Sequence, residues 1–158
     1  MKTALIPGSF DPMTVGHLDI IERTSAVFDK VVVAVMINEN KKYCFTMEER
    51  KKIAELSVAH LDNVTVVSYS GWLYDLFDMV SADAIVKGVR NEKDLAYENE
   101  MALFNISKNP KAHTLYLPAS SELEEVSSTL FRSTEDRSYA VSKYIPDGAK
   151  EYVLSILK

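Results

Sequence analysis

Short apolar runs alternate along the chain with stretches in which apolar residues return every three or four positions. The run over residues 31–37 is apolar throughout rather than at every second position, which is typical of a parallel strand covered on both faces. Comparable short runs predict further strands over residues 4–6, 64–69, 84–89 and 114–117.

Helical periodicity fills the segments between these strands. Thr46 is followed three positions later by Glu49, a capping box that predicts a helix from this point to about His60. The other expected helices carry apolar stripes at Ile20, Ile21, Thr24, Val27 and Phe28; at Leu73, Leu76, Phe77 and Val80; at Leu95, Ala102, Leu103 and Ile106, ending before Pro110; and at Ala149, Tyr152, Val153 and Ile156.

This alternation of strands and helices predicts an α/β fold. We expect a single domain over residues 1–158, a doubly wound, Rossmann-like parallel sheet of about five strands with helices on both faces. No linker or repeat suggests a second domain. In such folds ligands bind beyond the carboxyl ends of the strands, so the residues that directly follow a strand are the candidates for chemistry.

Composition and charge narrow the class of protein. Hydrophobic residues make up 47% of the chain and charged residues 26%, which is ordinary for a globular domain. A formal net charge of −5 argues against binding to nucleic acid or to an anionic membrane. One cysteine, Cys44, allows no internal disulfide, so a cytoplasmic location is expected. No apolar stretch is long enough to span a membrane, and residues 4–6 are too few for a signal peptide.

The first strand leads into a motif, residues 8–17, that is rich in Gly, Ser, Asp and Thr. Gly8 permits a close backbone approach, and Gly16 allows a phosphate near the start of the next helix, where free N–H groups favour anions. His17, on that first turn, is able to donate a hydrogen bond to phosphate oxygens. A lone histidine is more often a helix-surface residue, but this setting favours a phosphate site.

Other phosphate and metal motifs are absent from the sequence. There is no G-x-G-x-x-G after the first strand and no G-x-x-x-x-G-K-[ST], which argues against a dinucleotide dehydrogenase and a P-loop kinase. No H-E-x-x-H or Cys/His cluster indicates zinc.

Gly8-Ser9-Phe10-Asp11-Pro12, followed by Thr14-Val15-Gly16-His17, resembles the T-x-G-H signature of the nucleotidyltransferase superfamily. Further blocks follow in order along nearly the whole chain, at Lys41-Lys42, residues 45–50, residues 87–90, Tyr97-Glu98 and residues 126–129. Together they are similar to the bacterial phosphopantetheine adenylyltransferases. The resemblance implies transfer of the adenylyl group of ATP to 4′-phosphopantetheine, with dephospho-coenzyme A and pyrophosphate as products. It also implies direct in-line attack, Mg²⁺ bound with ATP and a homohexamer.

The same resemblance implies roles for individual residues. His17 would stabilise the transition state, with Lys41 and Arg90 supplying charge. The residues expected to bind ATP are Ser9, Phe10, His17, Gly88, Val89, Arg90, Glu98, Leu123, Glu124, Glu125, Val126, Ser127, Ser128 and Thr129. The residues expected to bind the acceptor are Ser9, Lys41, Leu73 and Lys87, with Phe104 as a further apolar wall. No protein metal ligands are expected, because the metal would be held by ATP phosphates and water.

Some positions depart from the usual pattern of that family. Lys87 stands where an arginine is usual, which keeps the charge but loses the forked geometry. Residues 123–129 contain Glu124 and Glu125 and no aromatic residue, unlike the common aromatic-Ser-Phe-Ile-Ser-Ser-Ser. Residues 128–132 also resemble the S-T-x-x-R ending of nicotinamide mononucleotide adenylyltransferases.

Alternatives therefore stay open at this point. The chain is expected to act on 4′-phosphopantetheine, because the blocks that match include the residues that would contact this acceptor. An adenylyl- or cytidylyltransferase for another acceptor, such as nicotinamide mononucleotide, is the first alternative. A silent nucleotide-binding module is the second, although intact Ser9, His17, Lys41 and Arg90 argue against it.

Overall fold

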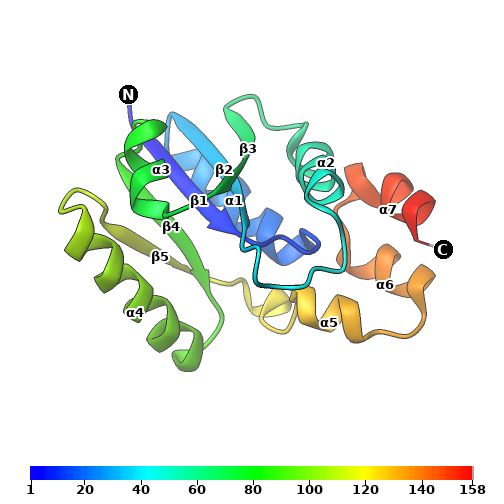
Figure 1. Ribbon diagram of the computed structural model, residues 1–158. Coiled ribbons are helices and arrows are strands. Elements are labelled where there is room, and N and C mark those ends of the chain that lie inside the picture. Colours follow the sequence, from blue (N-terminus) through cyan, green and yellow to red (C-terminus); the bar gives the residue numbers. More distant parts are fainter. Residues whose placement is uncertain (158) are drawn as a thin grey trace.

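The computed structural model describes residues 1–157 and contains one sheet of parallel strands in the order β3-β2-β1-β4-β5. The strands are β1 (Thr3–Gly8), β2 (Lys30–Ile37), β3 (Val64–Ser70), β4 (Ala84–Val89) and β5 (Thr114–Pro118). Every strand expected from the sequence is confirmed, and β1 lies at the centre between β2 and β4 (Figure 1). The predicted doubly wound α/β fold is therefore confirmed.

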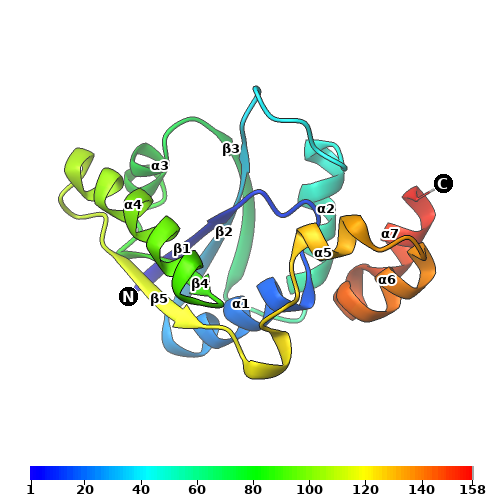
Figure 2. The same cartoon turned by 90° about the horizontal axis from the view of Figure 1, so that it is seen from below.

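Helices cover both faces of this sheet, as expected. In both views α3 (Leu73–Met79) and α4 (Glu92–Lys108) lie on one side (Figure 1 and Figure 2). The other side is covered by α1 (Val15–Val27) and α2 (Met47–Val58). Because successive side chains of a strand point to opposite faces, Val31, Val33 and Val35 pack under α1 and α2, whereas Val32 and Ala34 pack with Leu76 and Phe77 of α3.

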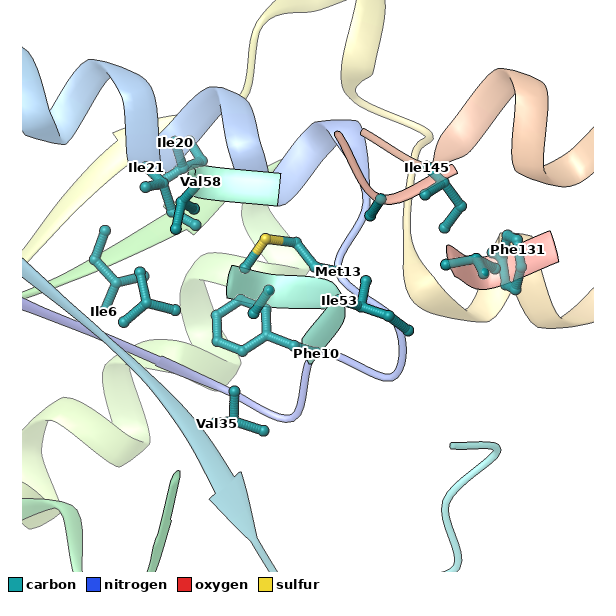
Figure 3. Close-up of a cluster of buried hydrophobic side chains, with 14 of the residues drawn as sticks. Ile6, Phe10, Met13, Ile20, Ile21, Val35, Ile53, Val58, Phe131 and Ile145 are labelled. Carbon is teal, nitrogen blue, oxygen red and sulfur yellow. The ribbon is translucent and has the colours of Figure 1, made fainter. Parts of the chain in front are cut away.

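The larger core lies between the sheet, α1 and α2 (Figure 3), and includes Ile6, Phe10, Ile21 and Ile53. The C-terminal segment extends it, because Phe131 and Ile145 pack against the same cluster. This segment contains α5 (Ser128–Ser133), α6 (Arg137–Tyr144) and α7 (Lys150–Ile156), with short 3-10 turns at Ser121–Leu123 and Asp147–Ala149. None of the helices among the described residues is long and apolar enough to cross a membrane.

The helix starts follow local chemistry. The predicted capping box at Thr46 is confirmed, since Glu49 N donates to Thr46 Oγ1 over 3.1 Å and Thr46 N donates to Glu49 Oε1 over 2.9 Å. Helix α4 is confirmed as an element, but its apolar stripe is not core, because Leu95 is 41% and Leu103 61% exposed. The α4 residues that border a cavity beside this helix are mainly outside the stripe, with Tyr97, Met101 and Phe104 among them, and Ala102 is the one stripe residue that takes part.

The chain leaves β1 towards α1 on one face of the sheet and leaves β4 towards α4 on the other. These two strands are neighbours, so the direction of winding reverses between them. A crevice forms at such a reversal beyond the carboxyl ends of the strands, and this is where α/β proteins bind ligands. The sequence motifs after β1 and β4 therefore meet at one place.

Candidate active site

Two cavities lie at the carboxyl ends of β1 and β4. The first, of about 290 Å³, is bordered by the β1–α1 connection, by β4 and α4, and by residues 119–127. The second, of about 400 Å³, is bordered by the end of β1, by residues 71–73 and by α4. The residues that line both are Pro7, Gly8, Ser9, Lys87 and Glu98. Two ligands, one in each cavity, would therefore meet beside Ser9 and Lys87.

His17 lines the first cavity from the first turn of α1. Its Nδ1 accepts a hydrogen bond from the backbone N–H of Thr14 over 2.9 Å. A backbone N–H only donates, so Nδ1 carries a lone pair and the neutral ring keeps its proton on Nε2. Burial, and then the charges of Lys87 and Arg90, lower the pKa of His17 to about 4. At neutral pH the ring is therefore an uncharged N–H donor.

Phe10 shapes the floor of the same cavity. It is 3% exposed, takes a positive φ of 47°, and its ring meets the His17 ring edge-on with 5.1 Å between centroids. A Cβ atom at Gly8 would lie 3.0 Å from the Phe10 ring, so this position has little room for a side chain. Phe10 is thus a packing residue that orients His17 and also lines the cavity.

The cations of the site are paired with carboxylates on α4. Lys87 Nζ lies 3.3 Å from Glu98 Oε2, at the boundary of the two cavities. Arg90 donates through Nε to Asp94 Oδ2 over 2.8 Å and through Nη2 to Asp94 Oδ1 over 3.3 Å. The hydrogen bond from Arg90 is the main reason why the pKa of Asp94 lies below its ordinary value. Asp94 was not identified from the sequence, although its position four residues after Arg90, on the first turn of α4, was the available signal.

The segment after β5 contributes to the first cavity only in part. Leu123, Val126 and Ser127 line it, whereas Glu124, Glu125, Ser128 and Thr129 line neither of the two cavities. Ser127 caps α5 by accepting a hydrogen bond from Leu130 N over 3.0 Å. Ser128 Oγ donates to the Pro12 carbonyl over 2.7 Å, and so it fixes this segment to the N-terminal motif.

The second cavity has the apolar walls expected for it. Leu73 and Phe104 line it, together with Tyr97 of the Tyr97-Glu98 block and with Trp72 and Met101, which were not identified from the sequence. Trp72 is 58% exposed and its ring lies 5.6 Å from that of Phe104. Aromatic rings offer a large apolar surface to a ligand and lose little conformational freedom when it binds. The walls of this cavity therefore suit a long, weakly polar ligand.

Lys41 lies outside these two cavities. It borders a third hollow, of about 330 Å³, which is formed by residues 37–39, 41, 43–47 and Arg50. Its Nζ is 5.6 Å from the centre of the Tyr43 ring. The expected contact of Lys41 with the acceptor thus stays a prediction.

Asp11 connects the motif to the loop that carries Lys41. It is 5% exposed, and its carboxylate accepts hydrogen bonds from the backbone N–H groups of Cys44 over 2.8 Å and Phe45 over 2.9 Å. Arg132 donates to the Asp11 carbonyl over 2.9 Å. The aspartate of the motif therefore has a structural role, which its position in the sequence alone did not reveal.

Among residues 1–157 no group of three or more His, Cys, Asp or Glu is arranged to hold a metal ion. The carboxylates that line the first cavity, Asp94 and Glu98, are already engaged by Arg90 and Lys87. This donor set does not fit a divalent ion ligated by the protein.

This geometry defines a class of protein, and comparisons with known proteins agree with it. Residues 5–134 match the cytidylyltransferase-like family model, so the chain is a nucleotidyltransferase-type protein. A putative nicotinate-nucleotide adenylyltransferase from Vibrio parahaemolyticus has the same fold, with a TM-score of 0.72 at 22% identity over 98% of this chain and 99% of that one.

Comparison of sequences gives the particular family. A phosphopantetheine adenylyltransferase from Limosilactobacillus reuteri is 40% identical over 151 residues, 96% of this chain and 87% of that protein. A phosphopantetheine adenylyltransferase from Clostridium perfringens is 41% identical over 146 residues, 92% of this chain and 89% of that protein. The chain belongs to the phosphopantetheine adenylyltransferase family, which confirms the resemblance noted in the sequence.

Proposed function

We propose that this protein transfers the adenylyl group of ATP to 4′-phosphopantetheine, giving dephospho-coenzyme A and pyrophosphate in the synthesis of coenzyme A. The observation that carries the proposal is the pair of cavities that meet at Ser9 and Lys87. One contains a neutral histidine donor and an arginine, and the other has apolar and aromatic walls. Family membership supplies the identity of the two substrates.

ATP fits the first cavity. Arg90 and the amino-terminal turn of α1, with Gly16 and His17, suit phosphate groups, because the N–H groups and dipole of a helix start favour anions. Leu123, Val126 and Ser127 would border the nucleoside. We assign Gly88 and Glu98 to ATP because they line this cavity from β4 and α4. We assign Val89 to ATP because it lies between Gly88 and Arg90 in the family block at residues 87–90.

Phosphopantetheine fits the second cavity. Its pantetheine arm would lie against Leu73 and Phe104, and its phosphate would come next to Lys87 and Ser9 at the junction. An oxygen of that phosphate attacks the α-phosphorus of ATP. A P–O bond to the acceptor forms, the bond from the α-phosphorus to the bridging oxygen breaks, and pyrophosphate leaves.

The chain contributes placement and charge rather than a covalent nucleophile. The Nε2–H group of His17 would donate a hydrogen bond to a non-bridging oxygen of the α-phosphate. Because the ring is neutral, it would keep this proton rather than transfer it to the phosphate. Lys87 and Arg90 would offset charge on the acceptor and on the departing pyrophosphate. Lys41 is assigned to the acceptor phosphate, which it would approach from its loop.

Three further assignments rest on the family. Mg²⁺ would enter with ATP, held by phosphate oxygens and water. Assembly into a homohexamer and a cytoplasmic location are the other two, and the single free Cys44 is compatible with a reducing compartment.

The alternative acceptor, nicotinamide mononucleotide, finds no support in the geometry. Glu124 and Glu125, the acids able to attract its cationic ring, are exposed and line neither cavity. Arg132 of the S-T-x-x-R segment donates to the Asp11 carbonyl and to Thr129 Oγ1, so it is occupied within the chain.

The test is a pyrophosphate-release assay with ATP, Mg²⁺ and either acceptor. We expect phosphopantetheine to give a kcat/KM higher by several orders of magnitude, since specificity is a difference in transition-state binding. A higher kcat/KM for nicotinamide mononucleotide would overturn the proposed acceptor, and nucleotide binding without pyrophosphate release with any acceptor would overturn the proposed activity.

A further inference from the structure

The loop between β2 and α2 carries Lys41 at its tip and is fixed at both ends. At its start, Asn38 N donates to the Tyr43 hydroxyl over 3.0 Å, and Lys41 N donates to the Asn38 carbonyl over 3.0 Å. At its end, the N–H groups of Cys44 and Phe45 are held by the Asp11 carboxylate. Tyr43 therefore closes the loop on itself, and Asp11 ties the loop to the motif after β1.

Beneath this loop lies a buried cation. Arg50 is 1% exposed and forms no ion pair with any carboxylate among residues 1–157. Its Nη1 donates to the Ser9 carbonyl over 2.8 Å and to the Met36 carbonyl over 3.1 Å, while its Nε has no hydrogen-bond partner in the described part of the chain. A buried guanidinium without a counter-ion is costly, so other contacts must compensate for it.

The Tyr43 ring supplies such a contact. Arg50 Cζ lies 3.8 Å from the centre of this ring, a distance at which the guanidinium stacks on the aromatic face. The ammonium of Lys41 lies 5.6 Å from the centre of the same ring. One aromatic side chain thus connects the lysine at the tip of the loop, through Arg50, to the Ser9 carbonyl at the junction of the two cavities.

We propose that Tyr43 is a positioning residue for Lys41: its ring, stacked on Arg50, sets the place from which Lys41 reaches the acceptor phosphate. The inference rests on the proposed function, because it takes the phosphate of the acceptor to lie beside Ser9 and Lys87. The contact between Lys41 and the ring is long and partly open to water, so a phosphate dianion displaces it. The stack on Arg50 is short and buried, so it persists while Lys41 moves.

A positioning role and a purely structural role of Tyr43 predict different effects on the two substrates. If Tyr43 only shielded Arg50, its removal would disturb the Ser9 region and affect both substrates. If Tyr43 positions Lys41, its removal affects the acceptor alone, and only while Lys41 is present. A double-mutant cycle separates the two cases.

The experiment measures pyrophosphate release by the full chain for Tyr43→Ala, Lys41→Ala and the double variant, varying each substrate in turn. We expect Tyr43→Ala to raise the acceptor KM on the order of tenfold, the size typical of coupled neighbours. The KM for ATP should change by less than about twofold. The double variant should be no worse than Lys41→Ala alone, and Tyr43→Phe should retain most of the acceptor affinity because it keeps the ring.

Tyr139→Ala is the matched control. Tyr139 is 47% exposed on α6, with Lys143 Nζ 5.5 Å from its ring centre, and it lines none of the three cavities. Both KM values should stay as in the unmodified chain. Should Tyr43→Ala fail to fold, Tyr43→Leu decides, because it keeps an apolar cover over Arg50 and removes the aromatic face.

Independent, multiplying losses from Lys41→Ala and Tyr43→Ala would overturn the proposal, as would an equal rise in both KM values or an unchanged acceptor KM in Tyr43→Leu. An unmodified chain that releases no pyrophosphate with phosphopantetheine would instead overturn the proposed function.

Discussion

Replacing His17 by asparagine separates the two jobs of this side chain. In the unmodified chain Nδ1 accepts from Thr14 N over 2.9 Å and so helps to start α1, while the ring lines the first cavity and carries its proton on Nε2. An asparagine side chain reaches about as far as Nδ1, so its oxygen can keep the bond to Thr14 N. It has no donor at the position of Nε2. The change should therefore remove the donor and leave the helix start in place.

The expected loss is in turnover. Removing one preorganised donor to a developing charge typically lowers kcat by about 100- to 1,000-fold. With a pKa of about 4, roughly one His17 ring in a thousand is protonated at pH 7, so the lost group is a neutral donor. Pyrophosphate release under saturating substrates measures the effect, with His17→Gln as the control, since its amide N–H extends towards the position of Nε2. Turnover of His17→Asn within about threefold of the unmodified chain would refute this role.

The same ring makes stability depend on pH. An unfolded His17 takes up a proton near pH 6.5, whereas burial in the folded chain holds its pKa at about 4. The stability gained by keeping this ring neutral is thus fully present above pH 6.5. It is lost progressively as the pH falls from 6.5 through the folded pKa of about 4. Each unit by which folding lowers a pKa corresponds to about 1.4 kcal/mol. The shift from 6.5 to about 4 therefore makes the folded chain about 3 kcal/mol less stable at pH 4 than at pH 7.5. Urea unfolding at pH 7.5 and pH 4 should show this loss in the unmodified chain relative to His17→Asn, and an equal pH dependence of both would show that burial does not lower this pKa.

Three other changes test other parts of the site. Asp94→Asn removes the carboxylate that holds Arg90, so titration calorimetry should show ATP binding weakened by about three- to tenfold and acceptor binding unchanged; weaker acceptor binding alone would reverse the assignment. Lys87→Arg should preserve or tighten acceptor binding, because a guanidinium binds phosphate in a fork, and a large loss would show that this site requires lysine. Gly88→Ala should lower the free energy of unfolding by about 1–3 kcal/mol, because the added Cβ would lie 2.7 Å from Ile20 Cγ1; unchanged urea unfolding would show that Ile20 moves aside at no cost.

The central part of the sheet was predictable because β1, β2 and β4 carry runs of buried residues. In β2, five successive residues, Val31 to Val35, are at most 2% exposed, and such a strand has to be apolar at every position. The start of α2 was predictable from a local signal, the capping box at Thr46. By contrast, α6 was missed, because Ala140 and Val141 are its only buried residues and leave almost no apolar period.

The site residues that lie at or just after the carboxyl ends of strands were predictable. His17, Lys87 and Arg90 come together because β1 and β4 are neighbours in a doubly wound sheet. The position of Lys41 was not predictable, because its loop is held by Asp11, which lies 34 residues before Phe45 in the sequence, and by the stack of Tyr43 on the buried Arg50. Arg50 itself is an exception among arginines, which are seldom fully buried without a charged partner, and no pattern in the sequence reveals such a burial.

Direct transfer from ATP to the acceptor can be checked by the masses of the products. The protein is incubated with ATP, Mg²⁺ and 4′-phosphopantetheine, and both the small molecules and the intact protein are weighed by mass spectrometry. We expect dephospho-coenzyme A and pyrophosphate in equal amounts, no adenylylated protein, and no product when pantetheine without its phosphate is the acceptor. An adenylyl group on the protein, or ATP consumed without an adenylylated acceptor, would contradict direct transfer at the junction of the two cavities.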